Sequence, residues 1–258
     1  MSNLLIEKEG RVQLITINRP DKLNALNRRT ISELGEAIKR AEADKEVGVI
    51  IVRGSGEKAF VAGADIAEFH QFDLNQAKEL SQSGHDDLFD LVENTQKPVI
   101  AAINGFALGG GLELAMSCHI RVAASSAKMG LPEVSLGVIP GYGGTQRLAQ
   151  LAGKGKAFEM ISSAAMISAE DALAVGLVNH VVDQDELMDK CMQIAQQILK
   201  NSPTAIAAAI RTINAGYAEG VDGYEKEIEE FANCFTTADF KEGTDAFLSK
   251  RKPNFTGE

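Results

Sequence analysis

Apolar positions in the first 145 residues follow strand-like and helix-like patterns in alternation. Apolar and polar residues alternate over 12–17, which is typical of a half-buried strand, and the β-branched run at 47–52 is typical of a buried one. Between them, residues 31–41 repeat apolar side chains at helical spacing. The same patterns then predict a helix over 74–96, a strand over 98–103, a helix over 111–119 and a strand over 120–124. This alternation predicts an α/β fold whose strands are joined by helical crossovers.

After about residue 145 the pattern is helical, and capping signals mark where helices begin and end. Ser168, with Asp171 three residues later, predicts a capping box at a helix start, and Gly176 predicts a helix end. Asp183 and Asp239 are each followed three residues later by Glu, which predicts two more helix starts. The last part of the chain is therefore predicted to consist mainly of helices.

Two apolar stripes at helical spacing support this prediction. They are Leu187, Cys191, Ile194 and Ile198, and then Tyr224, Ile228, Phe231 and Phe235. No low-complexity linker or block of charge separates the two patterns, so the two parts should pack closely. We predict a core over residues 1–200 and a helical subdomain over 201–258.

Composition and charge narrow the class of protein. Of the 258 residues, 45% are hydrophobic and 24% charged, the ordinary balance of a globular protein. The net charge of −10 disfavours nucleic acid as a partner, because nucleic-acid-binding domains are basic. Three isolated cysteines, Cys118, Cys191 and Cys234, fit a reducing compartment, and the N-terminal segment lacks the features of a signal peptide. These observations predict a cytoplasmic protein.

The stretch 98–112 carries no charged side chain and resembles a membrane span at first sight. It is too short to cross a bilayer, contains four glycines and leads directly into Glu113. A buried strand followed by a buried helix explains it better, so no membrane partner is expected.

Two segments combine small residues with an acidic side chain. Residues 62–66, Ala-Gly-Ala-Asp-Ile, follow a strand-like run, and their small side chains would let another molecule approach the backbone. A tight turn with an Asp cap would have the same sequence. Residues 104–114 place three glycines at a helix start and Glu113 in its first turn, where free N–H groups and the helix dipole favour negative charge. A mere glycine-packed junction would not explain a Glu in the most apolar stretch of the chain.

A third segment, 130–147, is rich in Pro and Gly and carries Glu133. It predicts a rigid irregular loop, either functional or an Ω-loop with an exposed Glu133. Other chemistries lack their motifs, since the chain has no G-x-S-x-G, no P-loop and no Rossmann glycine pattern. The four histidines are too widely spaced to suggest a metal site, so no metal is expected.

Taken in chain order, these segments resemble the crotonase (enoyl-CoA hydratase/isomerase) superfamily. The resemblance rests on Asn18-Arg19-Pro20 with Leu23-Asn24-Ala25-Leu26, on 62–66, on Asn104-Gly105 through Gly109-Gly110-Gly111 to Glu113, on Pro132-Glu133, and on Ile139-Pro140-Gly141 to Gln146-Arg147. It continues through Gly176-Leu177-Val178 to Lys250-Arg251-Lys252 and so covers nearly the whole chain. It implies a spiral of ββα turns with a C-terminal helical region that trimerises. The implied assembly is a homo-oligomer, either a trimer or a dimer of trimers (a homohexamer).

The resemblance also implies the roles of five site residues. The N–H groups of Ala64 and Gly110 would form an oxyanion hole for a thioester carbonyl, and the N–H of Gly141 would position a water. Glu113 and Glu133 would form the catalytic pair. We expect Glu113 to be the base toward the water, since the helix dipole favours its charged form, and Glu133 to be the acid toward the α-carbon.

Coenzyme A is implied as part of the substrate and not as a separate cofactor. The backbone around Ala62, Asp65 and Ile66 would meet its adenine and pantetheine, and Lys22, Leu23 and Lys58 would lie near its nucleotide phosphates. Some members of the family have Lys at the position of Asp21, whereas this chain has its Lys one place later.

These residues predict an enoyl-CoA hydratase, which adds water across the 2,3 double bond of a trans-2-enoyl-CoA to give 3-hydroxyacyl-CoA in fatty-acid β-oxidation or related acyl-CoA metabolism. An enoyl-CoA isomerase of the same family needs only one base, although some members with both glutamates are bifunctional. An RNA-binding member would carry a comb of lysines over 31–44, where this chain is mostly acidic. A catalytically inactive scaffold would have no use for the glutamates and glycines.

Overall fold

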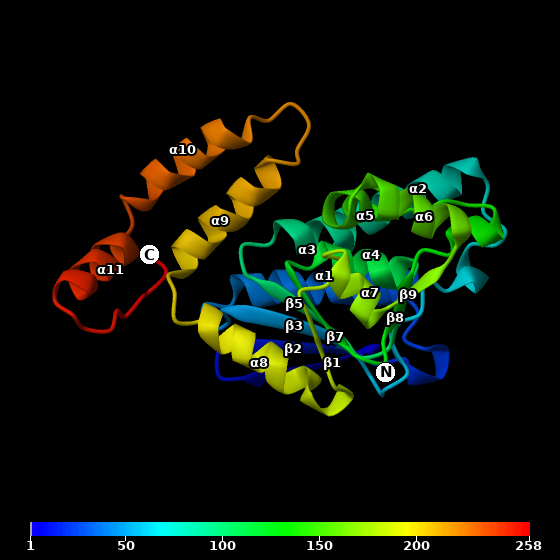
Figure 1. The fold of residues 1–258 in the computed structure, drawn as a ribbon, viewed down its shortest axis with the longest axis horizontal. Helices are drawn as coiled ribbons and strands as arrows, with labels where there is room; N and C mark the ends of the chain where they lie inside the picture. The colour runs from blue at the N-terminus through cyan, green and yellow to red at the C-terminus, as the bar shows by residue number, and fades with distance from the viewer. Residues whose placement is uncertain (1) are drawn as a thin grey trace.

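The computed structural model describes residues 2–258 and arranges the strands in two sheets (Figure 1). The larger sheet has the order β1 (Leu4–Glu9), β2 (Val12–Ile17), β3 (Val49–Gly54), β5 (Val99–Ile103), β7 (Ile120–Ala124) and β10 (His180–Val182). The smaller sheet has the order β4 (Ala59–Val61), β6 (Phe106–Leu108), β8 (Lys128–Gly130) and β9 (Met166–Ser168). Both sheets contain strands from several distant parts of the sequence.

The pairing of the strands shows how the chain winds. β1 and β2 form an antiparallel hairpin, and every later pair in the larger sheet is parallel. In the smaller sheet β4, β6 and β8 are parallel, and β9 runs antiparallel to β8. Each of three successive turns gives one strand to each sheet, β3 then β4, β5 then β6, and β7 then β8. The predicted spiral of ββα turns is confirmed.

Helices cover the sheets and form the C-terminal region (Figure 1). They are α1 (Arg28–Ala43), α2 (Leu74–Gly84), α3 (Asp90–Asn94), α4 (Gly110–Ser117), α5 (Gly144–Ala152), α6 (Lys154–Ser163), α7 (Ala169–Ala174), α8 (Leu187–Ile198), α9 (Pro203–Ala215), α10 (Gly223–Cys234) and α11 (Ala238–Leu248). Short turns are η1 (Pro20–Lys22), η2 (Ile66–Glu68), η3 (His85–Phe89), η4 (Glu133–Leu136) and η5 (Gln184–Glu186). The helix predicted over 74–96 is in fact α2, the π-helical turn η3 and α3 in succession.

Both faces of the larger sheet are buried, which explains the continuous apolar run in β3. Ile50 and Val52 point into the main core between the two sheets and the helices, whereas Val49 and Ile51 point to the opposite face. There they meet the predicted stripe of α8, which begins at Leu187. The capping box of Ser168 and Asp171 is also confirmed, with both of its reciprocal bonds present.

Helices α9, α10 and α11 lie to one side of the two sheets (Figure 1). The stripe predicted on α10 exists but faces outward, and Phe231, for example, is 66% exposed. The helix start predicted at Asp239 is confirmed to within one residue, since α11 begins at Ala238, but Thr237 and not Asp239 caps the helix. The Asp239 carboxylate is buried and accepts bonds from Ser202 and from the backbone of the C-terminal tail. The division of the chain at residue 200 stays a prediction.

No helix within residues 2–258 combines the length and the apolar character that a membrane crossing requires.

Candidate active site

Glu113 lies in the first turn of α4, in a junction that only glycine permits. Gly109 precedes the helix with φ +50°, a conformation that side chains disfavour. A Cβ placed on Gly111 would lie 2.0 Å from the Val61 carbonyl oxygen, so the helix can pack on β4 only because Gly111 has no side chain. The Glu113 side chain is thereby carried into the core and is 1% exposed.

Two backbone amides hold one oxygen of the Glu113 carboxyl. The N–H groups of Tyr142 and Gly144 both donate to Oε1, each at 2.8 Å. A Cβ on Gly144 would lie 2.8 Å from that same oxygen, so glycine is required for this approach. No hydrogen bond from residues 2–258 reaches Oε2. This second oxygen is therefore free to bind a water or a substrate.

The pKa of Glu113 is raised to about 7, and burial is the largest cause. The two N–H donors oppose this rise, while the nearby charge of Glu133 adds to it. Burial thus favours the neutral form of Glu113, opposite to the influence expected of the helix dipole.

Glu133 begins η4 and lies beside the same helix start, but the protein holds it differently. A Cβ on Gly109 would lie 2.9 Å from Glu133 Oε1, which places the two in contact. Its Oε2 is buried and has no hydrogen-bond partner within residues 2–258. Burial raises the pKa of this carboxyl. A buried oxygen without a partner is rare and suggests a ligand or a proton at that atom.

The N–H groups of Ala64 and Gly110 are adjacent and open. A Cβ on Gly110 would lie 3.8 Å from the Ala64 nitrogen, and neither amide donates to any acceptor in the described part of the chain. Leu26 fixes the Ala64 segment, since its N–H donates to the Gly63 carbonyl and its carbonyl accepts from Asp65. Two neighbouring open donors suit an oxygen on which negative charge develops.

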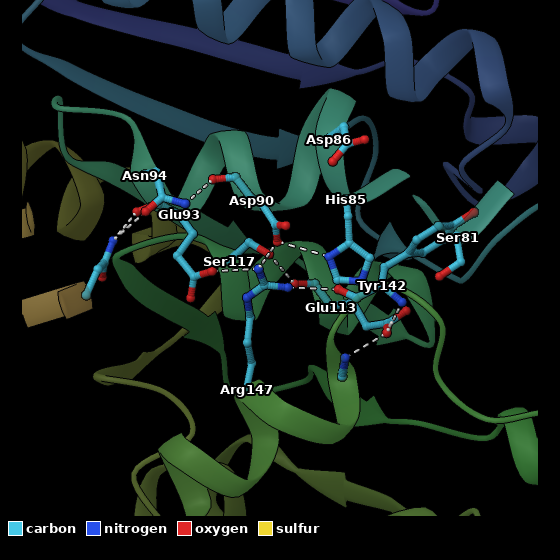
Figure 2. A network of polar contacts seen from close by, with 12 residues as sticks. Ser81, His85, Asp86, Asp90, Glu93, Asn94, Glu113, Ser117, Tyr142 and Arg147 are labelled. Carbon is cyan, nitrogen blue, oxygen red and sulfur yellow. Dashed lines mark hydrogen bonds and ion pairs between the residues drawn. The ribbon is translucent and has the colours of Figure 1, made fainter. Parts of the chain in front are cut away.

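The loop that supplies the two amides to Glu113 rests on the helical stretch 74–94. Ser81 Oγ donates to the Gly141 carbonyl at 2.6 Å, and the Tyr142 ring stacks on Phe89 with centroids 4.6 Å apart. A Cβ on Gly84 would lie 2.2 Å from the Tyr142 ring. Figure 2 shows Ser81, Tyr142 and Glu113, which come from segments distant in sequence, in one network of polar contacts. The Gly141 N–H has no acceptor within residues 2–258, so it is open to a water.

Two of the segments predicted for coenzyme A, at Leu23 and at Ala62, are paired near Ala64. The Leu23 carbonyl accepts from the Ala62 N–H at 3.0 Å, which pairs the two predicted segments. Leu23 and Ile66 are 40% and 46% exposed, so both apolar side chains are accessible to a ligand. Lys22 and Lys58 are exposed as well. Asp65, in contrast, forms an ion pair with Arg19 at 3.1 Å, so its carboxylate braces the loop.

Comparisons with known proteins agree with this geometry. The enoyl-CoA hydratase/isomerase family model matches residues 7–258. The chain belongs to this family. It is 47% identical over 253 residues to a short-chain-enoyl-CoA hydratase of Clostridium acetobutylicum, covering 98% of this chain and 97% of that protein. It is 46% identical to a crotonyl-CoA hydratase of Syntrophomonas wolfei over 98% of this chain and 97% of the relative.

A solved structure of an enoyl-CoA hydratase from Bacillus anthracis matches with a TM-score of 0.92 and 39% identity. The match covers 99% of this chain and all of the other, so the whole fold is that of the enoyl-CoA hydratase/isomerase family. The resemblance read from the sequence is thereby confirmed.

In this family member the fold brings together Glu113, Glu133, Ala64 and Gly110, as the resemblance implied. Sequence reasoning missed the clamp on Glu113, formed by the N–H groups of Tyr142 and Gly144. The signal for this clamp in the sequence was the pair Gly143-Gly144 at the start of α5, because Gly144 must leave room for a carboxylate. Residues 2–258 contain no group of three or more His, Cys, Asp or Glu side chains arranged to hold a metal.

Proposed function

We propose that this chain is an enoyl-CoA hydratase that converts a trans-2-enoyl-CoA to a 3-hydroxyacyl-CoA. The observation that carries the proposal is the meeting of the buried Glu113 and the part-buried Glu133 with two open amides at one helix start. Hydration needs a proton acceptor for water, a proton donor for carbon and stabilisation of an enolate-like oxygen. These groups can supply all three.

The thioester carbonyl oxygen is assigned to the N–H groups of Ala64 and Gly110. As water adds to the double bond, negative charge moves onto this oxygen, and fixed donors stabilise it without reorganising. Loss of one such donor typically lowers the rate by about 10²–10³.

The two carboxyls are assigned to the two proton transfers. Glu113 Oε2 takes a proton from the water, whose oxygen bonds to C3, while Glu133 gives a proton to C2. The double bond becomes a single bond, and exchange of one proton with solvent restores both carboxyls. The amides on Glu113 Oε1 leave Oε2 for the water, and the buried Oε2 of Glu133, which has no partner within residues 2–258, suits an oxygen that carries a proton. Gly141 N–H is a second contact for the same water.

Names of the relatives support a short substrate. Two proteins that are 46% and 47% identical are named for crotonyl-CoA and short-chain enoyl-CoA. The coenzyme A moiety is assigned to the edge formed by Leu23, Ala62 and Ile66, with Lys22 and Lys58 near the phosphates. An isomerase needs only one base, so the presence of both carboxyls, Glu113 and Glu133, favours hydration.

We further propose a homo-oligomer, a trimer or a dimer of trimers, acting in the cytoplasm without a metal or separate cofactor. The apolar stripe exposed on α10, including Phe231, is surface that a second copy of the chain would cover. Light scattering would test this assembly, and a stable active monomer of 27.6 kDa would contradict it.

A panel of enoyl-CoA thioesters of increasing chain length tests the function directly. Hydration removes the conjugated enoyl absorbance, and crotonyl-CoA should react with the highest kcat/KM of the panel. A purified, folded protein that hydrates no member of the panel would overturn the proposal. Fast turnover of only the longest chains would refute the short substrate and retain the reaction.

A further inference from the structure

Arg147 is a buried cation that joins three parts of the active-site scaffold. Its Nη2 donates to Asp90 Oδ1 and Glu93 Oε2, each at 2.6 Å, and its Nη1 donates to the Tyr142 carbonyl at 2.8 Å (Figure 2). Its side chain is 7% exposed. A buried guanidinium is costly unless its donors are used, so this position demands an explanation.

The bond to Tyr142 links Arg147 to Glu113 through one residue. The Tyr142 carbonyl accepts from Arg147, and the Tyr142 N–H donates to Glu113 Oε1. The backbone N–H of Arg147 also donates to the Gly143 carbonyl at 2.9 Å. Gly143 has φ +92°, and a Cβ there would lie 2.2 Å from Arg147 Nη1. The loop is therefore shaped around the guanidinium.

We propose that Arg147 is a positioning residue for hydration, holding the 142–144 loop so that both of its amides stay on Glu113 and direct the free oxygen at the water. This inference rests on the proposed function. Asp90 and Glu93 hold the guanidinium from the side of α3, and His85 Nδ1 contacts Asp90 Oδ1 at 3.0 Å. Ser81 supports the loop at its other end, through the Gly141 carbonyl.

A purely structural ion pair between α3 and α5 would explain the bonds to Asp90 and Glu93 but not the bond to Tyr142. The chain offers a contrast in Arg121, another buried arginine, which donates to the carbonyls of Leu177 and Cys118. Arg121 meets the C-terminal end of α4, whereas Arg147 meets the loop that touches the carboxyl at its N-terminal end. Arg121 therefore serves as a matched control for loss of a buried guanidinium.

The pH dependence of kcat separates positioning from stability. The amides of Tyr142 and Gly144 lower the pKa of Glu113, and so does the charge of Arg147, while burial and Glu133 raise it. Removing Arg147 weakens the hydrogen bonds from the Tyr142 and Gly144 amides and removes the positive charge. Each of these changes raises the Glu113 pKa. Because Glu113 must be charged to accept a proton, the acid limb of the profile moves to higher pH.

The experiment compares Arg147→Met, Arg147→Lys, Ser81→Ala and Arg121→Met by crotonyl-CoA hydration across the acid limb and by thermal unfolding. Arg147→Met should lower kcat by about 10², the scale of a misplaced catalytic group, with KM little changed and the acid limb shifted upward. Arg147→Lys keeps the positive charge but not the planar guanidinium that bonds several acceptors at once, so it should recover only part of the lost kcat. Ser81→Ala changes no charge. It should move the acid limb to higher pH, as Arg147→Met does, but by a smaller amount. Arg121→Met should lower stability and leave the limb in place.

The outcomes separate this inference from the function on which it rests. Wild-type protein that hydrates no enoyl-CoA overturns both. Active wild type with normal kcat and an unmoved acid limb in folded Arg147→Met overturns the inference alone. The inference is also overturned if Arg147→Lys recovers the full kcat and the acid limb of Ser81→Ala does not move. The positive charge alone would then explain the loss in Arg147→Met. If Arg147→Met does not fold, Arg147→Lys and Ser81→Ala decide the question.

Discussion

Glu113 and Glu133 lie at the same helix start, yet the protein holds their carboxyls in different ways. Glu113 Oε1 receives two backbone amides, which come from a loop that Arg147 and Ser81 brace. Glu133 has one buried oxygen that no donor within residues 2–258 reaches. Burial raises the pKa of both carboxyls; two amides of a distant loop oppose the rise at Glu113, whereas at Glu133 its own backbone N–H opposes it. One residue type can thus serve as a base or as an acid according to the donors placed around it.

The largest effects should come from removing each carboxyl in turn. Glu113→Gln and Glu133→Gln should each lower kcat for hydration by about 10²–10⁴, because an amide keeps the shape but cannot exchange protons. Thermal unfolding below about pH 5 and coenzyme A affinity serve as controls and should change little. Near-normal hydration in either folded variant would remove that glutamate from the mechanism.

The double variant tests whether the two carboxyls act as a unit. Its loss in kcat should be smaller than the product of the two single losses, since both groups serve one water and one substrate. Residual isomerase activity, measured with a 3-enoyl-CoA, should survive in Glu113→Gln, which keeps the group assigned to the α-carbon. Isomerase activity that survives only in Glu133→Gln would exchange the roles assigned to the two glutamates.

A smaller effect should follow from disturbing the clamp while leaving both carboxyls in place. The Cβ of Gly144→Ala would lie 2.8 Å from Glu113 Oε1, so the loop must shift and kcat should fall by up to about 10². Gly155→Ala in α6 is the matched control, because nothing in residues 2–258 lies within 4 Å of its Cβ. The alanine should stabilise this helix by about 0.5–1 kcal/mol. Equal kcat in the two variants would show that the clamp has no role in the rate.

The pH dependence of stability should reveal the raised pKa of Glu113 without any assay of activity. The folded protein binds the Glu113 proton more tightly than the unfolded chain, so stability falls as pH rises from 4.5 to about 7 and stays reduced above that. The Gln side chain is uncharged at every pH and therefore does not contribute to this pH dependence. Glu113→Gln should therefore gain up to about 3 kcal/mol over wild type at alkaline pH, and little of this below about pH 5.

Glu230→Gln provides a control of opposite sign. The hydrogen bond from Arg211 lowers the Glu230 pKa to about 2, so its contribution is present above the unfolded pKa and is lost at acid pH. Glu230→Gln should thus lower the melting temperature most at neutral and alkaline pH. A constant difference between Glu113→Gln and wild type across the whole range would contradict the raised pKa.

Much of the fold was readable from the sequence because local patterns dictate local structure. The alternation over 12–17 became β2, and the stripe that begins at Leu187 became the buried face of α8. Ser168 with Asp171 formed the capping box of α7. The exception at Asp239 is informative. Its carboxylate sits within one residue of a helix start, but the tail and Ser202 use it instead, and sequence spacing alone does not show such a competitor.

The sequence by itself determined which groups the site contains. Three glycines beside Glu113 in an apolar stretch, and Glu133 in a rigid loop, are local features that require no partner to be recognised. Only the tertiary structure decided how these groups behave. The amides that hold Glu113 lie 29 and 31 residues away, and the arginine that holds their loop is set by two acids on α3. The pKa of a carboxyl depends on its burial and on the donors within reach, and both arise only when distant segments meet.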